Sequence, residues 1–481
     1  MTQLGGEGMP WIGLAPYTSR THMVQNVGDG SLFHSSYMNI RFAIAAGSNI
    51  TFKILFNGAV ANTGAQAPVG GKSVEELVRL LALEGVRRIV VLTQNPETYR
   101  RAAFPAVAQV CDADDLEAAS RELQNTPGVT VLIYDGTCAN ERRRRQKRGK
   151  AAPRTRFVVV NEDVCENCGD CGSLTNCMSL GKVETEFGIK TQIHQSSCNQ
   201  DQSCIRGECP SFVSFEVEPG TGIRKPQARP LEVAIPEPDY PRTLARPYHI
   251  YSPGVGGTGV LTLNAVLAQA AAFDGKRVFS YDQTGAAQKW GAVLSSLIVA
   301  EPEHDVAANK IGAGRADVYL ALDILAGADP VNLDRCDPEH TVAVINTSLL
   351  PSGEMIRDVH FSVTPLLLIE AIRAVTRKDV DVRLAARSIA EGAFGDHMMM
   401  NLVTLGAAYQ AGLIPVSAAS IGDAIRLNGV AVENNLLAFS YGRLAVYDSA
   451  ALLALVAAQQ PLADRLAGAG ESGASLELFR R

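Results

Sequence analysis

The sequence predicts an α/β protein of several domains, with parallel sheets at both ends of the chain and a cysteine-rich segment between them. Short, continuous apolar runs alternate with helical patterns, as expected of parallel strands that are buried on both faces. Seven of the ten cysteines fall between Cys165 and Cys209. A chain of 481 residues is long enough for about two to four domains.

The first predicted domain covers residues 1–155 and is built around a parallel sheet. Its clearest helix is Ser73–Gly85, which has apolar residues at helical spacing, a serine at the N-cap and a glycine at its end. The expected strands are the β-rich or continuously apolar runs 49–56, 88–93 and 129–134.

The rest of the chain divides into a cysteine segment, a linker and a second α/β domain. The cysteine segment covers residues 156–225. Residues 226–247 contain six prolines and no periodicity, which predicts a linker. Residues 248–481 resume the α/β alternation and become mostly helical after about Pro365. The expected strands here are 248–251, 277–281, 317–321 and 341–345. No internal repeat is apparent.

Composition excludes several classes of protein. A net charge of -6 argues against a general nucleic-acid binder, which would be basic. No stretch resembles a membrane span, and the N-terminus lacks the basic and apolar regions of a secretory signal. Clustered cysteines in a chain of this size indicate a metal centre in a reducing compartment rather than a disulfide scaffold. We therefore expect a cytoplasmic protein that binds neither nucleic acid nor membrane.

The first motif is Gly28-Asp29-Gly30, followed by Asn57 at the end of an expected strand. Two glycines around an aspartate allow a sharp turn and a close approach of the backbone to a diphosphate. Aspartate and asparagine oxygens suit Mg²⁺, and ligands in open α/β sheets lie at the carboxyl ends of the strands. The alternative is an ordinary turn. His22 precedes the motif and is a candidate contact for a substrate carboxylate or the diphosphate, or else a structural residue.

The second motif is the cysteine cluster. Three cysteines at CxxC spacing followed by a more distant cysteine before proline are typical of an iron–sulfur cluster, whereas structural zinc uses two separate pairs. The candidate ligands are Cys165, Cys168, Cys171, Cys177, Cys198, Cys204 and Cys209. Seven cysteines do not fill two clusters of four. Either one cluster has spare cysteines, or a second cluster takes another ligand, for which His194 is the nearest candidate.

The third motif is the glycine loop Gly254–Gly259, which has the pattern GxGxxG between an expected strand and a helix. Such a loop places a helix N-terminus against an anion. Asp282 ends the next expected strand and is a candidate for binding a ribose. An NAD-linked dehydrogenase is therefore one interpretation of this region.

Taken together, these stretches resemble 2-oxoacid:ferredoxin oxidoreductases, above all the large fused indolepyruvate ferredoxin oxidoreductases of bacteria. GGEGMPWIGLAPYT with NITFKILFNGAVANTGAQ resembles the end of their thiamine-diphosphate domain, and CENCGDCGSLTNC resembles their iron–sulfur segment. SPGVGGTGVLTL and FGDHMMMNLVTLGAAYQAGLIPVS resemble their gamma domain, a Rossmann-like domain with a helical end whose glycine turn binds no nicotinamide.

The resemblance implies a set of cofactors and site residues. Mg²⁺ would be bound by Asp29, Asn57 and the backbone carbonyl of Ala59, and Asn62 would lie beside the thiazolium ring and the substrate. At least one [4Fe–4S] cluster is implied, with CoA as co-substrate. The chain departs from the family at Gly58, where Asp is usual, and at Ala65, where Gly is usual.

The implied reaction is the oxidative decarboxylation of an aryl 2-oxoacid to its acyl-CoA, with ferredoxin as the electron acceptor. Only 27 residues precede Gly28, where the family has a further strand, a helix and a preceding domain. We therefore expect a missing N-terminal part or a partner subunit, and a dimeric assembly. The alternatives are a non-catalytic electron-transfer or assembly subunit, and the NAD-linked dehydrogenase.

Overall fold

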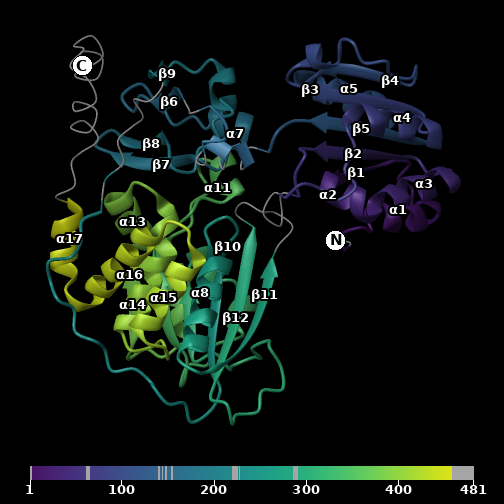
Figure 1. The fold of residues 1–481 in the computed structure, drawn as a ribbon. Helices are drawn as coiled ribbons and strands as arrows, with labels where there is room; N and C mark the ends of the chain where they lie inside the picture. The colour runs from purple at the N-terminus through teal and green to yellow at the C-terminus, as the bar shows by residue number, and fades with distance from the viewer. Residues whose placement is uncertain are drawn as a thin grey trace. The chain divides into compact units, whose positions relative to one another are not determined.

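The structure is a computed structural model, and it describes residues 3–60, 66–138, 141–142, 145–146, 149–152, 155–218, 226, 228–284 and 291–457. The chain divides into two compact units, Met1–Pro153 and Arg154–Arg481 (Figure 1). Each unit contains its own α/β sheet. Among the described residues, no helix is long and apolar enough to cross a bilayer.

The first unit is a five-stranded sheet in which every pair of neighbouring strands is parallel. The strand order is β1-β2-β5-β3-β4, with bounds β1 Met23–Gly28, β2 Ile50–Phe56, β3 Arg88–Thr93, β4 Ala108–Asp112 and β5 Val129–Asp135. The structure thus confirms the three strands and the parallel sheet predicted for this region. Strands β1 and β4 were not predicted. They are the two edge strands of the sheet, and neither is a continuously buried apolar run.

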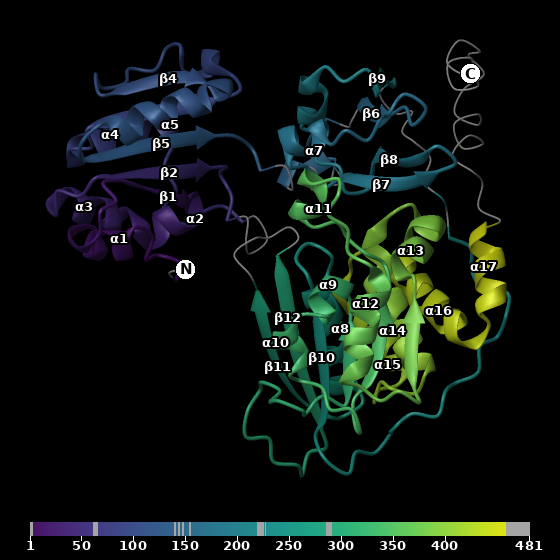
Figure 2. The ribbon, with the colours of Figure 1, turned by 180° about the vertical axis from the view of Figure 1, so that it is seen from behind.

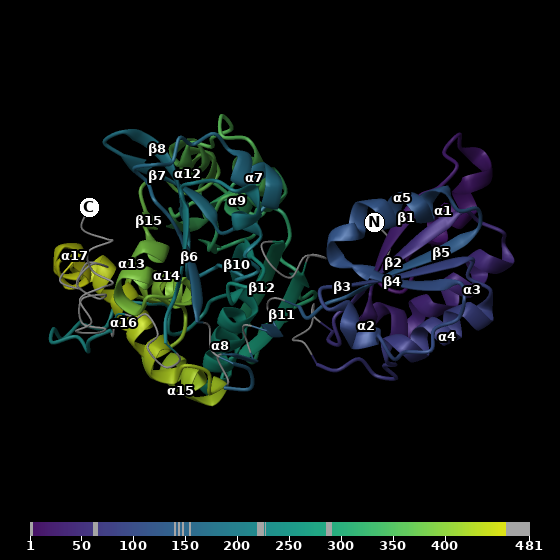
Figure 3. The same cartoon turned by 90° about the horizontal axis from the view of Figure 1, so that it is seen from above.

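Helices cover both faces of this sheet (Figure 3). Helices α1 (Met9–Leu14), α3 (Tyr37–Ala45) and α4 (Val74–Glu84) pack with the larger part of the core, and α5 (Leu116–Asn125) packs on the other face. Helix α4 begins as its sequence predicts. Ser73 Oγ accepts the N–H of Glu76, and the Glu76 carboxylate accepts the N–H of Ser73. It ends at Gly85, whose φ of 98° favours glycine.

The cysteine segment folds as two similar halves, which corrects the expectation of no internal repeat. In the first half, β6 (Arg156–Val160) leads through a cysteine loop and α7 (Asp170–Thr175) to β7 (Leu180–Thr185). In the second, β8 (Gly188–Ile193) leads through a cysteine loop and the short helix η6 (Ser203–Gly207) to β9 (Phe212–Glu216). The halves interlock, because β6 pairs with β9 and β7 pairs with β8, both antiparallel.

The second unit also contains a six-stranded sheet of order β11-β12-β10-β13-β14-β15. Its bounds are β10 Tyr248–Val255, β11 Arg277–Thr284, β12 Ala292–Ala300, β13 Val318–Ala321, β14 Val342–Asn346 and β15 Asp381–Leu384. The four predicted strands are confirmed, and β12 and β15 are additional. Strand β12 is antiparallel to both of its neighbours, and the remaining pairs are parallel.

Figures 1 and 2 show the two faces of this sheet from opposite sides. One face carries α8 and the helical end of the domain, and the other carries α9, α10 and α12. The bounds are α8 Val260–Phe273, α9 Ile324–Gly327, α10 Pro330–Leu333, α11 Gly353–Arg357, α12 Pro365–Ala374, α13 Ala386–Phe394, α14 Met400–Gln410, α15 Ala418–Asn428, α16 Val432–Tyr447 and α17 Ser449–Ala457. Helices α14 and α16 pack closely at Gly406 and Gly442, where an added methyl group would lie 2.0 and 1.9 Å from backbone oxygens of the facing helix.

The described residues of the proline-rich segment 226–247 form no helix or strand, as the prolines predict, but they pack against the helical end of the second unit. Glu237 accepts a hydrogen bond of 2.5 Å from Tyr409 and pairs with Arg443 at 3.0 Å. The Tyr441 hydroxyl donates to the carbonyl of Arg229, and Leu244 is buried. These contacts fix the segment to the fold.

Candidate functional site

Asp29 and Asn57 lie together at the carboxyl edge of the first sheet. Asp29 directly follows β1, Asn57 directly follows β2, and the two strands are parallel neighbours. The Asp29 carboxylate is 1% exposed, and its Oδ2 accepts the backbone N–H groups of Asn57, Gly58 and Ala59 at 3.0, 2.7 and 3.3 Å. Sequence reasoning thus chose three residues, Asp29, Asn57 and Ala59, that the fold brings together.

The two glycines of this motif do not form the sharp turn that the sequence predicted. Gly28 has the extended backbone of a strand (φ -79°), and Gly30 lies in the short helix α2 (Asp29–Ser31), so neither makes a left-handed turn. A methyl group added at Gly30 would lie 2.9 Å from Val60 Cγ1, whereas one at Gly28 would meet no atom within 4 Å. Gly30 therefore permits close packing, and Gly28 leaves open space beside Asp29.

The chemistry of this edge fits Mg²⁺ and a diphosphate. The donor set consists of a carboxylate, the Asn57 amide oxygen and a backbone carbonyl, which are the hard oxygen ligands that Mg²⁺ prefers. No basic side chain pairs with the buried Asp29 carboxylate within the described part of the chain. Asn57 Oδ1 is also turned toward the loop, where it accepts the N–H of Ala59 at 3.0 Å.

Two further predicted residues stand apart from this group. His22 precedes β1 at the opposite end of the strand, so roughly 20 Å of extended chain separate it from Asp29. Its Nε2 lies 2.8 Å from Thr51 Oγ1, and burial lowers the pKa of its imidazole. The structure does not bring His22 to the candidate site, because it lies at the amino end of the sheet. Asn62 and Ala65 lie outside the described residues.

Sequence reasoning missed a buried carboxylate next to the motif. Glu7 is 7% exposed and accepts hydrogen bonds from the hydroxyls of Ser31 and Ser36, both at 2.5 Å. Burial alone would raise its pKa, but these hydrogen bonds lower the pKa overall. Glu7 thereby fixes the helical segment that begins at Asp29. The signal in the sequence was an acidic residue between glycines in GGEGM.

Six cysteines of the second unit lie in two groups of three. Burial raises the pKa of the Cys171 thiol, and the neighbouring thiols of Cys168 and Cys165 add to this rise. Burial likewise raises the pKa of Cys204 to about 11, with the thiols of Cys177 and Cys198 and the Asp201 carboxylate beside it. Thiols gathered in this way lose their protons readily only when a metal replaces the proton. The thiol arrangement fits iron–sulfur binding.

His194, the predicted non-cysteine ligand, is engaged elsewhere. Its Nε2 lies 2.5 Å from Glu391 Oε1 on α13, and its Nδ1 lies 2.8 Å from Ser197 Oγ. His397 completes this group, which has the ligand types of a metal site. However, Arg387 also pairs with Glu391 at 2.8 Å, and this positive charge disfavours a cation there. The group joins the cysteine segment to the helical end of the unit.

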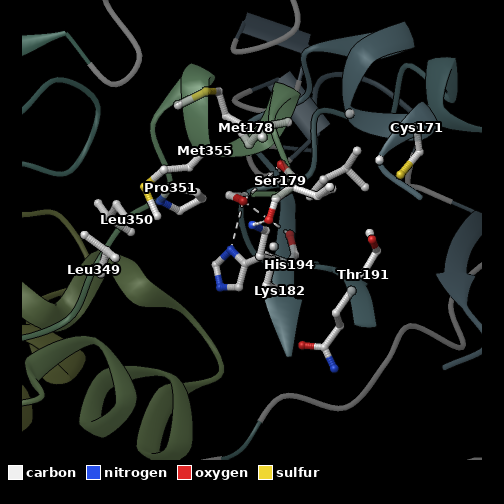
Figure 4. Close-up of a pocket in the computed structure, with 18 of the residues that line it drawn as sticks. Cys171, Met178, Ser179, Lys182, Thr191, His194, Leu349, Leu350, Pro351 and Met355 are labelled. Atoms are coloured by element: carbon white, nitrogen blue, oxygen red, sulfur yellow. Dashed lines mark hydrogen bonds between the residues drawn. The ribbon is translucent and has the colours of Figure 1, made fainter. Parts of the chain in front are cut away.

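A cavity of about 350 Å³ lies between the cysteine segment and the loop 349–359 of the same unit (Figure 4). Its walls combine apolar side chains, among them Met178, Leu350 and Met355, with the cationic Lys182. Cys171 lies at its border. Part of its polar wall is hydrogen-bonded, since Ser197 joins His194 to Ser179.

The glycine loop 254–259 connects β10 to α8, as predicted. Gly254 allows close packing of the strand on the helix, since an added methyl would lie 2.6 Å from Val260 Cγ2. Asp282 lies on β11, and β12 separates β11 from β10. Its carboxylate already accepts hydrogen bonds from Asn264 and Ser295 at 2.8 and 2.5 Å. In a nicotinamide site the acidic residue follows the strand next to the glycine loop, so this arrangement does not support ribose binding.

Comparison with known families matches residues 249–445 to the family described as pyruvate ferredoxin/flavodoxin oxidoreductase. Indolepyruvate oxidoreductase subunit IorB of Methanothermobacter thermautotrophicus is 29% identical over 201 residues, which cover 40% of this chain and 95% of that protein. The IorB subunit of Archaeoglobus fulgidus is 29% identical over 192 residues, covering 39% of this chain and 90% of that protein.

Two solved structures resemble part of the chain. A pyruvate oxidoreductase subunit of Thermotoga maritima has a TM-score of 0.31 at 17% identity, covering 41% of this chain and 96% of that one. The gamma subunit of a keto/oxoacid ferredoxin oxidoreductase of Geobacter sulfurreducens has a TM-score of 0.29 at 21% identity, covering 42% of this chain and 98% of that one.

Proposed function

We propose, on the premise that residues 249–445 form a domain of the pyruvate ferredoxin/flavodoxin oxidoreductase family, that this chain works as part of a 2-oxoacid oxidoreductase. The proposed reaction is the oxidative decarboxylation of an aryl 2-oxoacid such as indolepyruvate. It yields the acyl-CoA and passes electrons to ferredoxin. Relatives named as indolepyruvate oxidoreductase subunits support the choice of substrate.

The observation that carries the proposal is the meeting of Asp29 and Asn57 at the carboxyl edge of one sheet. Asp29, Asn57 and the carbonyl of Ala59 would hold Mg²⁺, and the open space beside Gly28 would admit the diphosphate. Asn62 stays a proposed contact of the thiazolium ring. Because Asp29 is buried, its charge would act on the ion with little screening by water.

Thiamine diphosphate, when bound, would supply the nucleophilic carbon and hold the electron pair that carbon dioxide leaves behind. This chain's own residues would bind and orient that cofactor. The seven cysteines 165–209 would hold iron–sulfur centres that carry electrons one at a time, and CoA would accept the acyl group. We propose a cytoplasmic location, because such thiols persist in a reducing compartment.

We further propose that the chain acts with a partner polypeptide, in an assembly that is dimeric. Thiamine enzymes bind their cofactor between two domains, of which one supplies the carboxylate that activates the aminopyrimidine. Relatives that are themselves named as subunits support this view. The alternative is a non-catalytic electron-transfer subunit. In that case the cysteine segment would still carry electrons, but Asp29 would bind no cofactor.

The test is thiamine-diphosphate binding, measured by titration calorimetry with and without Mg²⁺. We expect binding that requires Mg²⁺ and disappears when EDTA removes the ion. Binding of NADH with no response to thiamine diphosphate would favour the dehydrogenase instead. The absence of both, together with an iron–sulfur absorption band, would favour the electron-transfer subunit.

A further inference from the structure

The two halves of the cysteine segment correspond residue by residue from the first to the third ligand position of each loop. The same interval along the chain separates Cys165 from Cys198 and Cys171 from Cys204. In that register the residue equivalent to Cys168 is Asp201. The hydrogen bonds repeat as well, since Cys165 N–H donates to the carbonyl of Asn161 at 3.1 Å and Cys198 N–H to the carbonyl of His194 at 3.2 Å.

The backbone conformation repeats at the same places. Asn167 and Gly169 flank Cys168 with φ of 54° and 87°. The residues that flank Asp201 are glutamines, yet Gln200 and Gln202 have φ of 63° and 59°. Left-handed backbone costs energy for residues other than glycine or asparagine and is retained mainly at functional sites. The loop around Asp201 therefore takes the shape of a ligand loop without the glycine that would ease it.

The side chains of the second loop meet around one cavity. Cys177, Cys198, Asp201 and Cys204 all line it, together with apolar side chains such as Val158 and Ile193. Cys177 comes from the first half of the segment. In proteins with two cubane clusters, the fourth cysteine of each half binds the cluster of the other half. Cys177 follows that rule. Cys209 is the fourth cysteine of the second half, one residue short of the position equivalent to Cys177, and by the same rule it falls to Cys165, Cys168 and Cys171.

Asp201 is placed to reach such a cluster. Its Oδ1 accepts the N–H and hydroxyl of Ser203 at 3.1 and 2.8 Å, which orients the carboxylate. Among the described residues, Oδ2 forms no hydrogen bond and is available to a metal. Asp201 is exposed, whereas the three cysteines around it are half-buried.

We propose that the segment holds two clusters, and that the second is bound by Cys177, Cys198, Cys204 and the carboxylate of Asp201. The inference rests on the proposed function in that the cysteines carry iron. This assignment explains how seven cysteines can bind two clusters without His194 as a ligand. A carboxylate is a harder ligand than a thiolate and binds cluster iron less firmly. The iron at Asp201 is therefore the exchangeable one.

The test uses the full chain, reconstituted with iron and sulfide without oxygen, and a one-electron oxidant, ferricyanide. Each [4Fe–4S]²⁺ that reacts gives [3Fe–4S]⁺, one Fe²⁺ and one electron, which ferricyanide accepts. We expect about eight iron atoms per chain before oxidation and about seven after it, because only one cluster loses a corner. The electron paramagnetic resonance signal of [3Fe–4S]⁺ should appear at about one spin per chain.

Two variants assign this signal to Asp201. Asp201→Cys should retain all of the iron and give no [3Fe–4S]⁺ signal under the same oxidation. Asp201→Ala should show that signal as soon as it is reconstituted under mildly oxidising conditions. The matched control is Asp163→Cys, which makes the same exchange at an exposed position before Cys165 and should behave as the unmodified chain.

The outcomes separate this inference from the proposed function. A chain with one stable [4Fe–4S] cluster, about four iron atoms and no response to either Asp201 variant would overturn the inference alone. A chain that binds no iron at all would overturn both. Unchanged signals in Asp201→Cys would show that another residue, or water, occupies the fourth corner, and would also refute the assignment.

Discussion

Asp29 Oδ2 lies 3.0 Å from the backbone nitrogen of Asn57, although 27 residues lie between them in the chain. The contact exists because β1 and β2 are parallel neighbours that end at the same edge of the sheet. It joins the strongest candidate ligand for Mg²⁺ to the loop that would supply the other two.

Replacing Asp29 by alanine should abolish Mg²⁺-dependent binding of thiamine diphosphate, because the buried anionic ligand is lost. It should also lower the free energy of unfolding by about 1–3 kcal/mol, since the N–H groups of Asn57 and Gly58 lose their acceptor. Asp29→Asn keeps a neutral acceptor, so it should spare most of the fold while still weakening Mg²⁺ binding. Calorimetry and denaturant unfolding measure the two effects separately.

Asp112→Ala is the control, because Asp112 is the last residue of β4, another strand of this sheet, and its side chain is exposed. It should leave cofactor binding unchanged. Asn57→Ala should weaken binding in the same direction as Asp29→Ala. Unchanged affinity in Asp29→Ala would show that the diphosphate does not bind at this edge.

Anaerobically purified chain should contain about four to eight iron atoms and no stoichiometric zinc. Cys168→Ser should lose the first cluster and much of the local fold, because metal binding and folding are coupled in such segments. Metal analysis and the visible spectrum before and after dithionite measure both. Cys111→Ser, in the first unit, should change neither. Stoichiometric zinc with negligible iron would contradict the assignment.

Acid should destabilise the second unit through His397. Burial lowers the pKa of His397 to about 4, although the nearby Asp396 opposes this shift. Between about pH 6.5 and pH 4, the unfolded chain therefore binds a proton at this histidine that the folded chain does not bind. The free energy of unfolding is highest above pH 6.5 and decreases as the pH falls through this range. By pH 5 the loss should be roughly 2 kcal/mol. Burial raises the pKa of Asp323 to about 6, which opposes this loss over the same pH range, so the contribution of His397 is measured as the difference between the full chain and a His397 variant at pH 7 and pH 5.

His397→Gln keeps a polar side chain but cannot titrate, so its loss between pH 7 and pH 5 should be clearly smaller. Groups with lowered carboxyl pKa values, such as Asp317 at about 2, respond only at lower pH and do not interfere. Equal slopes for both proteins would contradict the buried neutral imidazole.

The isolated chain should self-associate through the first unit. Strand β1 is an edge strand that pairs only with β2 among the described strands, and large apolar side chains near it are exposed. These are Leu14, Tyr17, Val24, Met38 and Phe42. Val24→Lys should reduce association by placing a charge on the open edge, and light scattering measures it. Leu83→Lys, on α4 and 85% exposed, is the control.

The same preparation should show no 2-oxoacid-dependent reduction of viologen dye with thiamine diphosphate, Mg²⁺, CoA and indolepyruvate. A partner polypeptide should restore it by supplying the carboxylate for the aminopyrimidine. A monodisperse chain that turns over alone would refute the need for a partner.

Gly254→Ala should destabilise the second unit by about 1–3 kcal/mol, because the new methyl overlaps Val260 and lies 3.3 Å from Leu322 Cβ. Such a loss of stability would show that Gly254 is needed for the packing of β10 against α8. NADH should bind neither protein in a fluorescence titration. Tight NADH binding that Gly254→Ala removes would revive the dehydrogenase.

The sequence by itself determined the features that depend on local patterns. Apolar runs predicted the buried strands, and Ser73 with Gly85 predicted the ends of α4, because caps and burial leave short-range signals. Asp29 in its glycine-flanked motif and Asn57 after a predicted strand were chosen from the sequence, and they meet because β1, which was not predicted, is the parallel neighbour of β2.

Only the tertiary structure decided which distant residues meet. His22 is six residues from Gly28 in sequence, yet an extended strand carries it to the far edge of the sheet. His194 lies near the cysteines in sequence, but its side chain turns to Glu391 on another element. Asp201 is proposed as a ligand because the fold places it at one cavity with Cys177, Cys198 and Cys204. Such contacts depend on strand order and on side-chain direction in space, and the local spacing of residues predicts neither.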